Sequence, residues 1–190
     1  MVEIEAKIRV GDHLAVRAAC ERNGGEFVGK YVETNWILDR AGGSLRAAGC
    51  GLRVREMEVL KGAPAGATLT YKGARHAGRL KEREEIEVGV GDAGAMLSLL
   101  EKVGFVTVLH YRKRRERWIV DGCRVELDEV PMLGAYVEIE GESEVAIVEV
   151  QGRLGLGGAP HEPASYVRLL LERCAAMGRK PADIGFESVE

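Results

Sequence analysis

The stretch EIEAKIR (residues 3–9) alternates charged and apolar residues without interruption. Successive side chains of a β-strand point to opposite faces, so this alternation predicts a strand over residues 2–10. Glu3, Glu5, Lys7 and Arg9 then share one face, and apolar residues share the other. The charged face suits a metal ion together with an anionic ligand, although a single such strand also fits an edge strand with a solvated face.

The same alternation returns in later predicted strands, and this repetition favours a function for the charged faces. Together these faces carry eight acids and eight bases: Glu3, Glu5, Glu85, Glu87, Glu126, Asp128, Glu138 and Glu140, with Lys7, Arg9, Arg53, Arg55, Lys72, Arg83, Lys113 and Arg115. Twisted sheets of many strands tend to curl or close. Closure with the apolar faces outward, beneath helices, would place these charges in a lumen. An open sheet with a solvated charged face is the alternative.

Turn and cap residues divide the chain into an α+β arrangement. Strands are expected at 2–10, 26–39, 51–60, 67–73, 82–90, 105–120, 123–130 and 135–141, with a turn at 41–44 and a polar loop at 74–80. Helices are expected from Asp12 to Arg22, from Asp92 to just before Gly104, near 143–154 and near 164–177. We expect one domain over residues 1–178, followed by a tail over 179–190.

Composition narrows the function classes. Hydrophobic residues make up 46% of the 190 residues, enough for a core, and aromatics only 5%, so aliphatic packing should dominate. The net charge of −3 argues against a general nucleic-acid-binding surface. The four cysteines form no CxxC pair, which predicts free thiols in a reducing cytoplasm. No signal peptide and no apolar run of about 20 residues is apparent, so we expect a cytoplasmic protein without a membrane span.

The mixture of charges indicates a ligand. Arginine and lysine neutralise phosphate oxygens, and arginine does so with two parallel hydrogen bonds. Clustered carboxylates in a narrow space need a cation to stay ionised, and oxygen ligands favour Mg²⁺ or Mn²⁺. A polyphosphate with a divalent metal satisfies both sets. The sequence has no GxxxxGK[ST] motif, so phosphate binding would depend on side chains.

Six segments, in order along the chain, resemble the signatures of the CYTH, or triphosphate tunnel metalloenzyme, superfamily. They are EIEAK (3–7), LRVR (52–55), LTYKG (69–73), REEIEV (83–88), KRRERW (113–118) and the closing LDEV, LG and VEIE run within 127–140. The resemblance implies a closed eight-stranded antiparallel β-barrel, the triphosphate tunnel, with helices packed outside.

The resemblance also implies site residues. Triphosphate would be bound by Lys7, Arg53, Arg55, Lys72, Arg83, Lys113 and Arg115. Divalent metal, Mg²⁺ or Mn²⁺, would be held by Glu3, Glu5, Asp128, Glu138 and Glu140, with Glu85, Glu87 and Glu126 as supporting tunnel carboxylates. No catalytic residue is assigned.

Within the superfamily, LTYKG, REEIEV and the helix that begins with Ser165-Tyr166 look most like the class IV adenylyl cyclases. Residues 40–51 depart from that group because they lack its HPxRDF and TDEALR motifs, and Ile37-Leu38-Asp39 stands where Tyr-Phe-Asp is usual. The expected activity is conversion of ATP to cyclic AMP and pyrophosphate. The alternatives are hydrolysis of inorganic tripolyphosphate or thiamine triphosphate, and a non-catalytic module that binds polyphosphate or nucleotides.

Two further segments leave alternatives open. His76, with Arg75 and Arg79, lies in the loop after Lys72 and either closes over a bound substrate or stays solvated. The apolar run at 169–171 either packs on the barrel or forms a homodimer contact.

Overall fold

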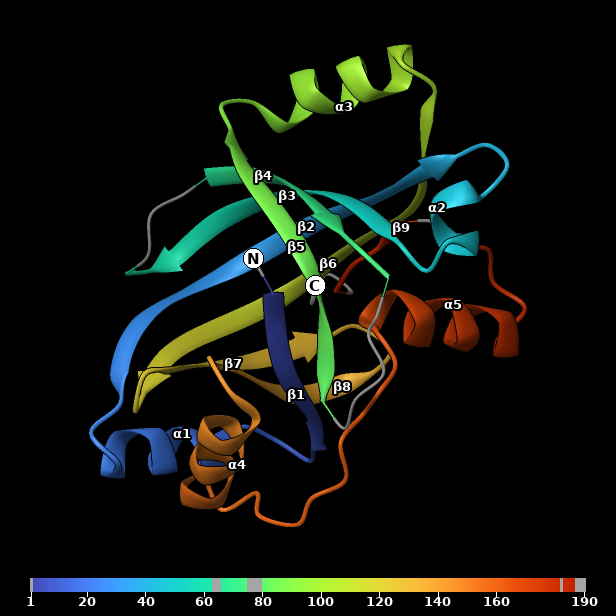
Figure 1. Cartoon of the computed structure of the whole chain (residues 1–190). Helices are drawn as coiled ribbons and strands as arrows, with labels where there is room; N and C mark the ends of the chain where they lie inside the picture. Colours follow the sequence, from blue (N-terminus) through green and yellow to red (C-terminus); the bar gives the residue numbers. More distant parts are fainter. Residues whose placement is uncertain (1, 63–65, 75–79, 182, 187–190) are drawn as a thin grey trace.

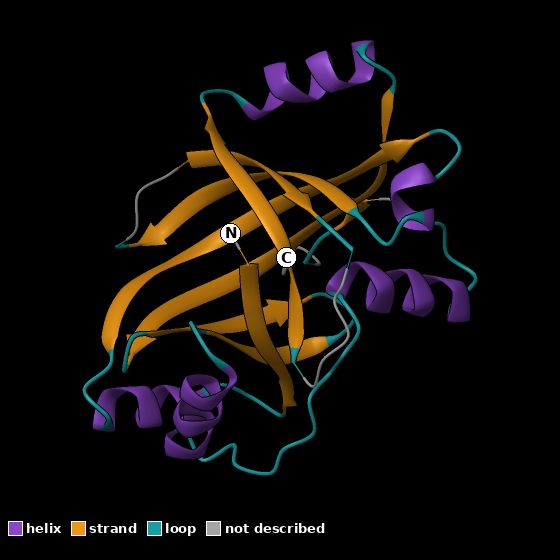
Figure 2. Cartoon of the chain, viewed as in Figure 1, coloured by secondary structure: helices purple, strands orange, loops and turns teal. Residues whose placement is uncertain are grey.

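The computed structural model describes residues 2–62, 66–74, 80–181 and 183–186, and its strands close into a barrel (Figures 1 and 2). The strands are β1 (Val2–Val10), β2 (Glu26–Arg40), β3 (Gly51–Lys61), β4 (Gly66–Lys72), β5 (Lys81–Val90), β6 (Phe105–Val120), β7 (Cys123–Val130) and β8 (Gly134–Glu140). Their order is β2-β3-β4-β5-β1-β8-β7-β6, and β6 pairs with β2 to complete the ring. All these pairs are antiparallel. The predicted closed eight-stranded barrel is confirmed, and the open sheet is excluded.

A short strand, β9 (Asp183–Ile184), adds to this barrel from the segment that was expected to be a tail. It pairs in parallel with β6, where Asp183 lies opposite His110 and Ile184 opposite Tyr111. Ile184 is buried in an apolar cluster with Tyr111 and Leu170. Part of the chain beyond residue 178 therefore packs on the barrel.

The two-residue period of the strands separates an apolar outer face from a charged inner face. On β1, Ala6 and Ile8 are buried on the outside, in one cluster with Val125 of β7 and Ile139 of β8. Helices α1 (Leu14–Arg22) and α4 (Glu144–Arg153) cover this part of the barrel. Helix α3 (Ala93–Lys102) lies across β3 and β6 at the opposite side (Figure 1).

Helix α5 (Tyr166–Ala176) packs against side chains from β6 and β8. Its Leu170 is buried, together with Tyr111 and Tyr136 of those strands. The apolar run at 169–171 therefore packs on the barrel, the first of the two alternatives for this helix. A homodimer stays a prediction.

Three local details differ from the predicted elements or lie beyond them. Helix α1 begins at Leu14 with His13 as its N-cap, and the Asp12 carboxylate instead accepts a hydrogen bond from the Leu14 amide at 2.8 Å. A short helix, α2 (Ser44–Ala47), follows the predicted turn, where Asp39 accepts hydrogen bonds from the Leu45 and Arg46 amides. The loop residues 75–79, which include His76, lie outside the described residues.

The remaining expectations concern cysteines and membranes. All four cysteines are free, and three of them are buried. Among the residues that the structure describes, no helix has the length and apolar character needed to cross a membrane.

Candidate functional site: a charged barrel lumen

The inner faces of the strands place most of the predicted site residues inside the barrel. Eight are buried: Glu5, Lys7, Arg55, Lys113, Arg115, Glu126, Asp128 and Glu138. Glu3, Arg53, Lys72, Arg83, Glu85 and Glu140 are partly buried, and Glu87 is 45% exposed. Arg9 shares the charged face of β1, but it is exposed and donates a hydrogen bond to the Leu133 carbonyl.

One side of the lumen holds what we call the buried network: Lys7, Glu33, Arg55, Lys113, Arg115, Glu126, Asp128 and Glu138. Arg115 is its centre, because its guanidinium contacts Glu126, Asp128 and Glu138 at once. Lys113 Nζ lies 2.8 Å from Asp128, and both side chains are almost completely inaccessible. Lys7 Nζ lies 3.4 Å from Glu138. Burial alone would lower the pKa of the Arg115 guanidinium. The nearby carboxylates of Asp128, Glu126 and Glu33 outweigh this effect and raise the pKa.

Glu33 belongs to this network but was not predicted from the sequence. It is fully buried on β2, with carboxylate oxygens 3.0 Å from Arg55 and 3.3 Å from Lys113. Asn35, two residues later, accepts a hydrogen bond from Arg55 Nε at 3.0 Å. The sequence could have indicated Glu33 and Asn35, because residues 31, 33, 35 and 37 alternate with their neighbours and therefore lie on one face of the strand.

Further lumen residues that were not predicted include two arginines and a tyrosine. Arg117 continues the inner face of β6 and contacts Glu126 at 2.6 Å, and Arg124 of β7 contacts Glu140 at 2.9 Å. Tyr166 enters from α5, and its ring centroid lies 4.0 Å from Lys7 Nζ and 5.1 Å from Lys113 Nζ. Because its partners lie on β1 and β6, helix α5 covers the lumen beside the buried network.

The other side of the lumen holds what we call the half-exposed cluster: Glu3, Arg53, Lys72, Arg83, Glu85 and Glu87. Lys72 Nζ lies 2.8 Å from Glu3 and 2.6 Å from Glu85. The Lys72 side chain is 15% exposed, and that of Arg83, which lies 3.5 Å from Glu3, is 24% exposed. A phosphate group can therefore approach these bases more easily than Lys113, which is 1% exposed.

Arg53 has unused hydrogen-bonding capacity. Its NH2 donates to Thr70 Oγ1 at 3.2 Å, and that hydroxyl donates to Glu87 at 2.7 Å. Its Nε is buried and has no hydrogen-bond partner among the described residues. A buried donor without a partner is unfavourable, so an anion placed against Arg53 would be stabilised.

A group of carboxylates between the two regions has the donor chemistry for a hard divalent cation. Glu5 on β1 lies opposite Glu140 on β8. Burial raises the pKa of Glu140 to about 7, and Glu126, Glu3 and Glu85 add to the rise despite the opposing effect of Arg124. Carboxylates that repel one another in this way would be stabilised by a bound cation.

The described residues do not, however, present a preformed cation site. Within them, no three His, Cys, Asp or Glu side chains are arranged to hold a metal ion. Glu3 is paired with Lys72, Asp128 with Lys113, and Glu140 with Arg124. A metal ion would fit this donor set only if the carboxylates exchanged some lysine and arginine partners for it.

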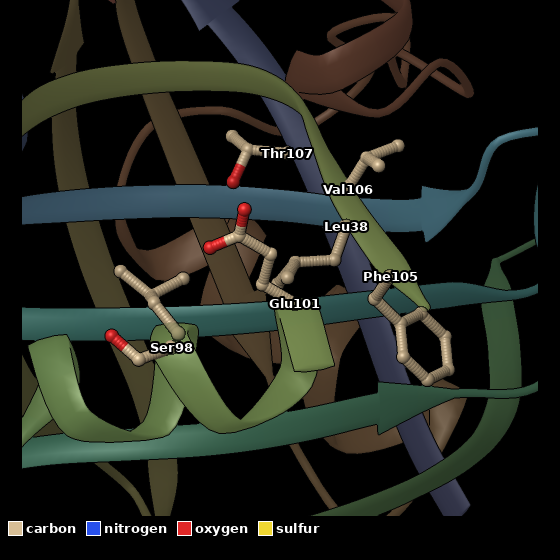
Figure 3. A pocket seen from close by; sticks show the side chains of 7 residues that line it. Leu38, Ser98, Glu101, Phe105, Val106 and Thr107 are labelled. Atoms are coloured by element: carbon tan, nitrogen blue, oxygen red, sulfur yellow. The ribbon is translucent and has the colours of Figure 1, made fainter. Parts of the chain in front are cut away.

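A hollow of about 330 Å³ lies outside the lumen, between α3 and the start of β6 (Figure 3). Its lining is mainly apolar or uncharged and includes Leu38, Phe105 and Val106, with Glu101 as the single charged side chain. Such a lining offers no cations for phosphate, so the lumen is the better candidate site.

Comparison with known proteins agrees with this geometry. The model of the CYTH domain family matches residues 1–147 of the chain. The chain belongs to the CYTH domain family. The match includes every residue that was predicted to bind triphosphate or metal. Helix α5 and strand β9 follow the matched region.

Individual relatives support the same assignment. A Methanocaldococcus jannaschii protein, provisionally named an adenylate cyclase, is 29% identical over 74% of this chain and 77% of its own. The solved PH1819 protein of Pyrococcus horikoshii is 29% identical, with a TM-score of 0.77 over 90% of this chain and 99% of its own. A Hippeastrum protein, provisionally named an adenylyl cyclase and described as having a dominant triphosphatase activity, shares the fold at 23% identity. Its TM-score is 0.68 over 93% of this chain and 96% of its own.

Proposed function

We propose that this protein is a divalent-metal-dependent enzyme that acts on triphosphate substrates inside its barrel, with conversion of ATP to cyclic AMP and pyrophosphate as the leading activity. The observation that carries the proposal is the half-exposed cluster, where Arg53, Lys72 and Arg83 lie within the lumen beside carboxylates. Paired charges of this kind serve phosphate and metal together. Membership of the CYTH family supports the proposal.

In this proposal the lumen bases hold the phosphate chain in place. Phosphoryl transfer depends mainly on neutralising charge and on aligning the attacking and leaving oxygens. Arg53, Lys72 and Arg83 would bind phosphate oxygens first, because they are accessible. Lys7, Arg55, Lys113 and Arg115 would stabilise the deeper oxygens, to the extent that their carboxylate partners release them.

The predicted metal ligands are Glu3, Glu5, Asp128, Glu138 and Glu140, with Glu85 and Glu126 nearby. Mg²⁺ or Mn²⁺ held there would act as a Lewis acid on phosphate oxygens and lower the pKa of a bound nucleophile. Tyr166 and α5 would keep bulk water away from the buried side of the lumen. The nucleophile would be the ribose 3′-hydroxyl in a cyclase, with pyrophosphate leaving, and water in a triphosphatase, with orthophosphate leaving.

A triphosphatase is the second candidate, and the environment of Ile37 favours it. Ile37 stands where the related cyclases usually carry tyrosine, and it packs into the apolar cluster with Leu109 and Tyr166. It therefore offers no polar group to a nucleotide. The description of the Hippeastrum protein as having a dominant triphosphatase activity supports the same candidate.

Product analysis separates the candidates. The purified protein is incubated with ATP, tripolyphosphate or thiamine triphosphate, with Mg²⁺ and then with Mn²⁺. Cyclic AMP with pyrophosphate establishes a cyclase, whereas orthophosphate without a cyclic product establishes a triphosphatase. Tight metal-dependent binding without any product would instead indicate a non-catalytic binding module.

A double variant tests the role of the metal in the same assay. Glu138→Gln with Glu140→Gln should abolish turnover, because both side chains lose the charge that holds the cation. Glu129→Gln is a matched control, because this neighbouring carboxylate lies outside the lumen and is 50% exposed. Wild-type turnover in the double variant would contradict the proposal.

A further inference from the structure

Glu33 is a charged lumen residue for which the proposed function provides no role. It belongs neither to the predicted metal ligands nor to the phosphate-binding bases. Its side chain is completely inaccessible, and it faces Arg55 at 3.0 Å, Lys113 at 3.3 Å and Arg115 at 3.7 Å. All three are buried bases that are expected to bind triphosphate.

We propose that Glu33 is a specificity-determining residue, a permanent internal counter-anion that keeps the polyphosphate chain out of the deepest part of the lumen. It occupies the position beside Arg55, Lys113 and Arg115 that a phosphate oxygen would otherwise take. The substrate then binds mainly to the half-exposed cluster, and additional phosphate groups add little affinity. This inference rests on the proposed function, because it presupposes that triphosphate enters the lumen.

The register of the sheet explains why Glu33 stays with these bases. Glu33 lies directly opposite Lys113 on β6, and its neighbour on the inner face, Asn35, lies opposite Arg55 on β3. The base partners come from both flanking strands, so the carboxylate is held from two sides. Burial alone would raise the pKa of Glu33, but Arg115, Arg55 and Lys113 together lower it, which keeps the carboxylate ionised at neutral pH.

Glu33 differs in this respect from Asp128 and Glu138 of the buried network. Asp128 and Glu138 are predicted metal ligands and would turn toward a cation, which would release Arg115 and Lys7 for phosphate. Glu33 is not a predicted metal ligand, and its inaccessible side chain is held by Arg55, Lys113 and Arg115. One negative charge therefore remains at the base of the lumen when substrate binds.

A gain of affinity distinguishes this role from a structural one. If Glu33 only stabilised the fold, removing its charge would leave binding unchanged or weaken it. If Glu33 competes with phosphate, Glu33→Gln should bind tripolyphosphate at least about tenfold more tightly. Pyrophosphate, which is shorter, should gain less.

The experiment is isothermal titration calorimetry of the full-length protein with pyrophosphate and with tripolyphosphate, first in EDTA and then in Mg²⁺. Glu58→Gln is the matched control, because Glu58 is 67% exposed and pairs with Arg112 outside the lumen. Its affinities should equal those of the wild type. Asn35→Asp makes the opposite change, because it adds a carboxylate beside Arg55, and it should weaken tripolyphosphate binding about tenfold.

The outcomes separate this inference from the proposed function. If the wild-type protein binds tripolyphosphate and folded Glu33→Gln binds it no more tightly, the inference is wrong and the proposed function stands. If the wild-type protein does not bind tripolyphosphate in either condition, the inference fails, and the product analysis with ATP decides the proposed function separately. If Glu33→Gln does not fold, Asn35→Asp decides, and affinity unchanged from the wild type overturns the inference.

Discussion

The buried network and the half-exposed cluster contain the same types of side chain, yet they differ in accessibility and therefore in what they can do. Lys113 and Asp128 are at most 1% exposed, whereas Arg53 and Glu87 of the half-exposed cluster are 15% and 45% exposed. Charges taken out of water must be matched closely by partners, and removing one partner is costly. Exposed pairs contribute little to stability and exchange partners easily. We infer that the buried network mainly organises the lumen and that the half-exposed cluster receives the ligand.

The largest expected difference between the two regions is in stability. Arg115→Met leaves Asp128, Glu126 and Glu138 without their shared partner, so it should reduce the free energy of unfolding by about 3–5 kcal/mol. Arg83→Met removes a partly exposed base and should reduce it by less than about 1 kcal/mol. Urea denaturation of both variants measures the difference, and equal losses would remove the distinction between the two regions.

For ligand affinity, the half-exposed cluster should matter more than the buried network. Lys72→Met removes an accessible base that lies between Glu3 and Glu85, and it should weaken tripolyphosphate binding about tenfold. Its free energy of unfolding should change by less than about 1 kcal/mol. Calorimetric titration alongside urea denaturation measures both quantities. An unchanged affinity would show that the half-exposed cluster does not receive the phosphate.

A smaller effect concerns the carboxylates between the two regions, and it depends on pH. The pKa of Glu140 is about 7 in the folded protein and is expected near 4.5 in the unfolded chain, so the folded state binds the extra proton. Stability should therefore fall as pH rises from about 4.5 to 7. In EDTA, the free energy of unfolding of Glu140→Gln should equal that of the wild type at pH 4. At pH 8 it should be larger by about 1–2 kcal/mol, a value that is reduced because Glu140 is partly exposed.

Free energies of unfolding measured across this pH range show whether Glu140→Gln is more or less stable than the wild type. Glu58→Gln, outside the lumen, should show no such pH-dependent gap. If the pair between Glu140 and Arg124 dominated instead, the wild type would be the more stable protein at pH 8. Added Mg²⁺ should narrow or reverse the gap, because the cation favours the ionised carboxylate.

The smallest expected effect lies at the most exposed position of the half-exposed cluster. Glu87→Gln weakens a contact of 3.7 Å with Arg53 at a position open to solvent. The free energy of unfolding should change by less than about 0.5 kcal/mol. A loss of several kcal/mol in urea denaturation would mean that this cluster is as tightly coupled as the buried network.

The sequence predicts most inner charges because alternation is strict where one face is apolar and the other charged, as in β1, residues 52–55 and residues 137–140. The alternation left an open sheet as an alternative, and the resemblance to the CYTH superfamily implied the closed barrel. Strand β2 breaks this alternation. Its inner positions 31, 33, 35 and 37 are Tyr, Glu, Asn and Ile, so neither face looks uniformly charged, and Glu33 was missed. The ion pairs could not be predicted either, because they depend on cross-strand register, such as Glu5 opposite Glu140. Tyr166 enters from a helix, so strand parity gives no information about it.

A crystal structure of the wild-type protein with Mn²⁺ and tripolyphosphate tests the central claim most directly, because anomalous scattering locates the metal. We predict phosphate oxygens against Arg53, Lys72 and Arg83, with Mn²⁺ among Glu3, Glu5 and Glu140 and Glu33 still beside Lys113. Phosphate and metal bound only outside the lumen, for example in the hollow beneath α3, would contradict the account.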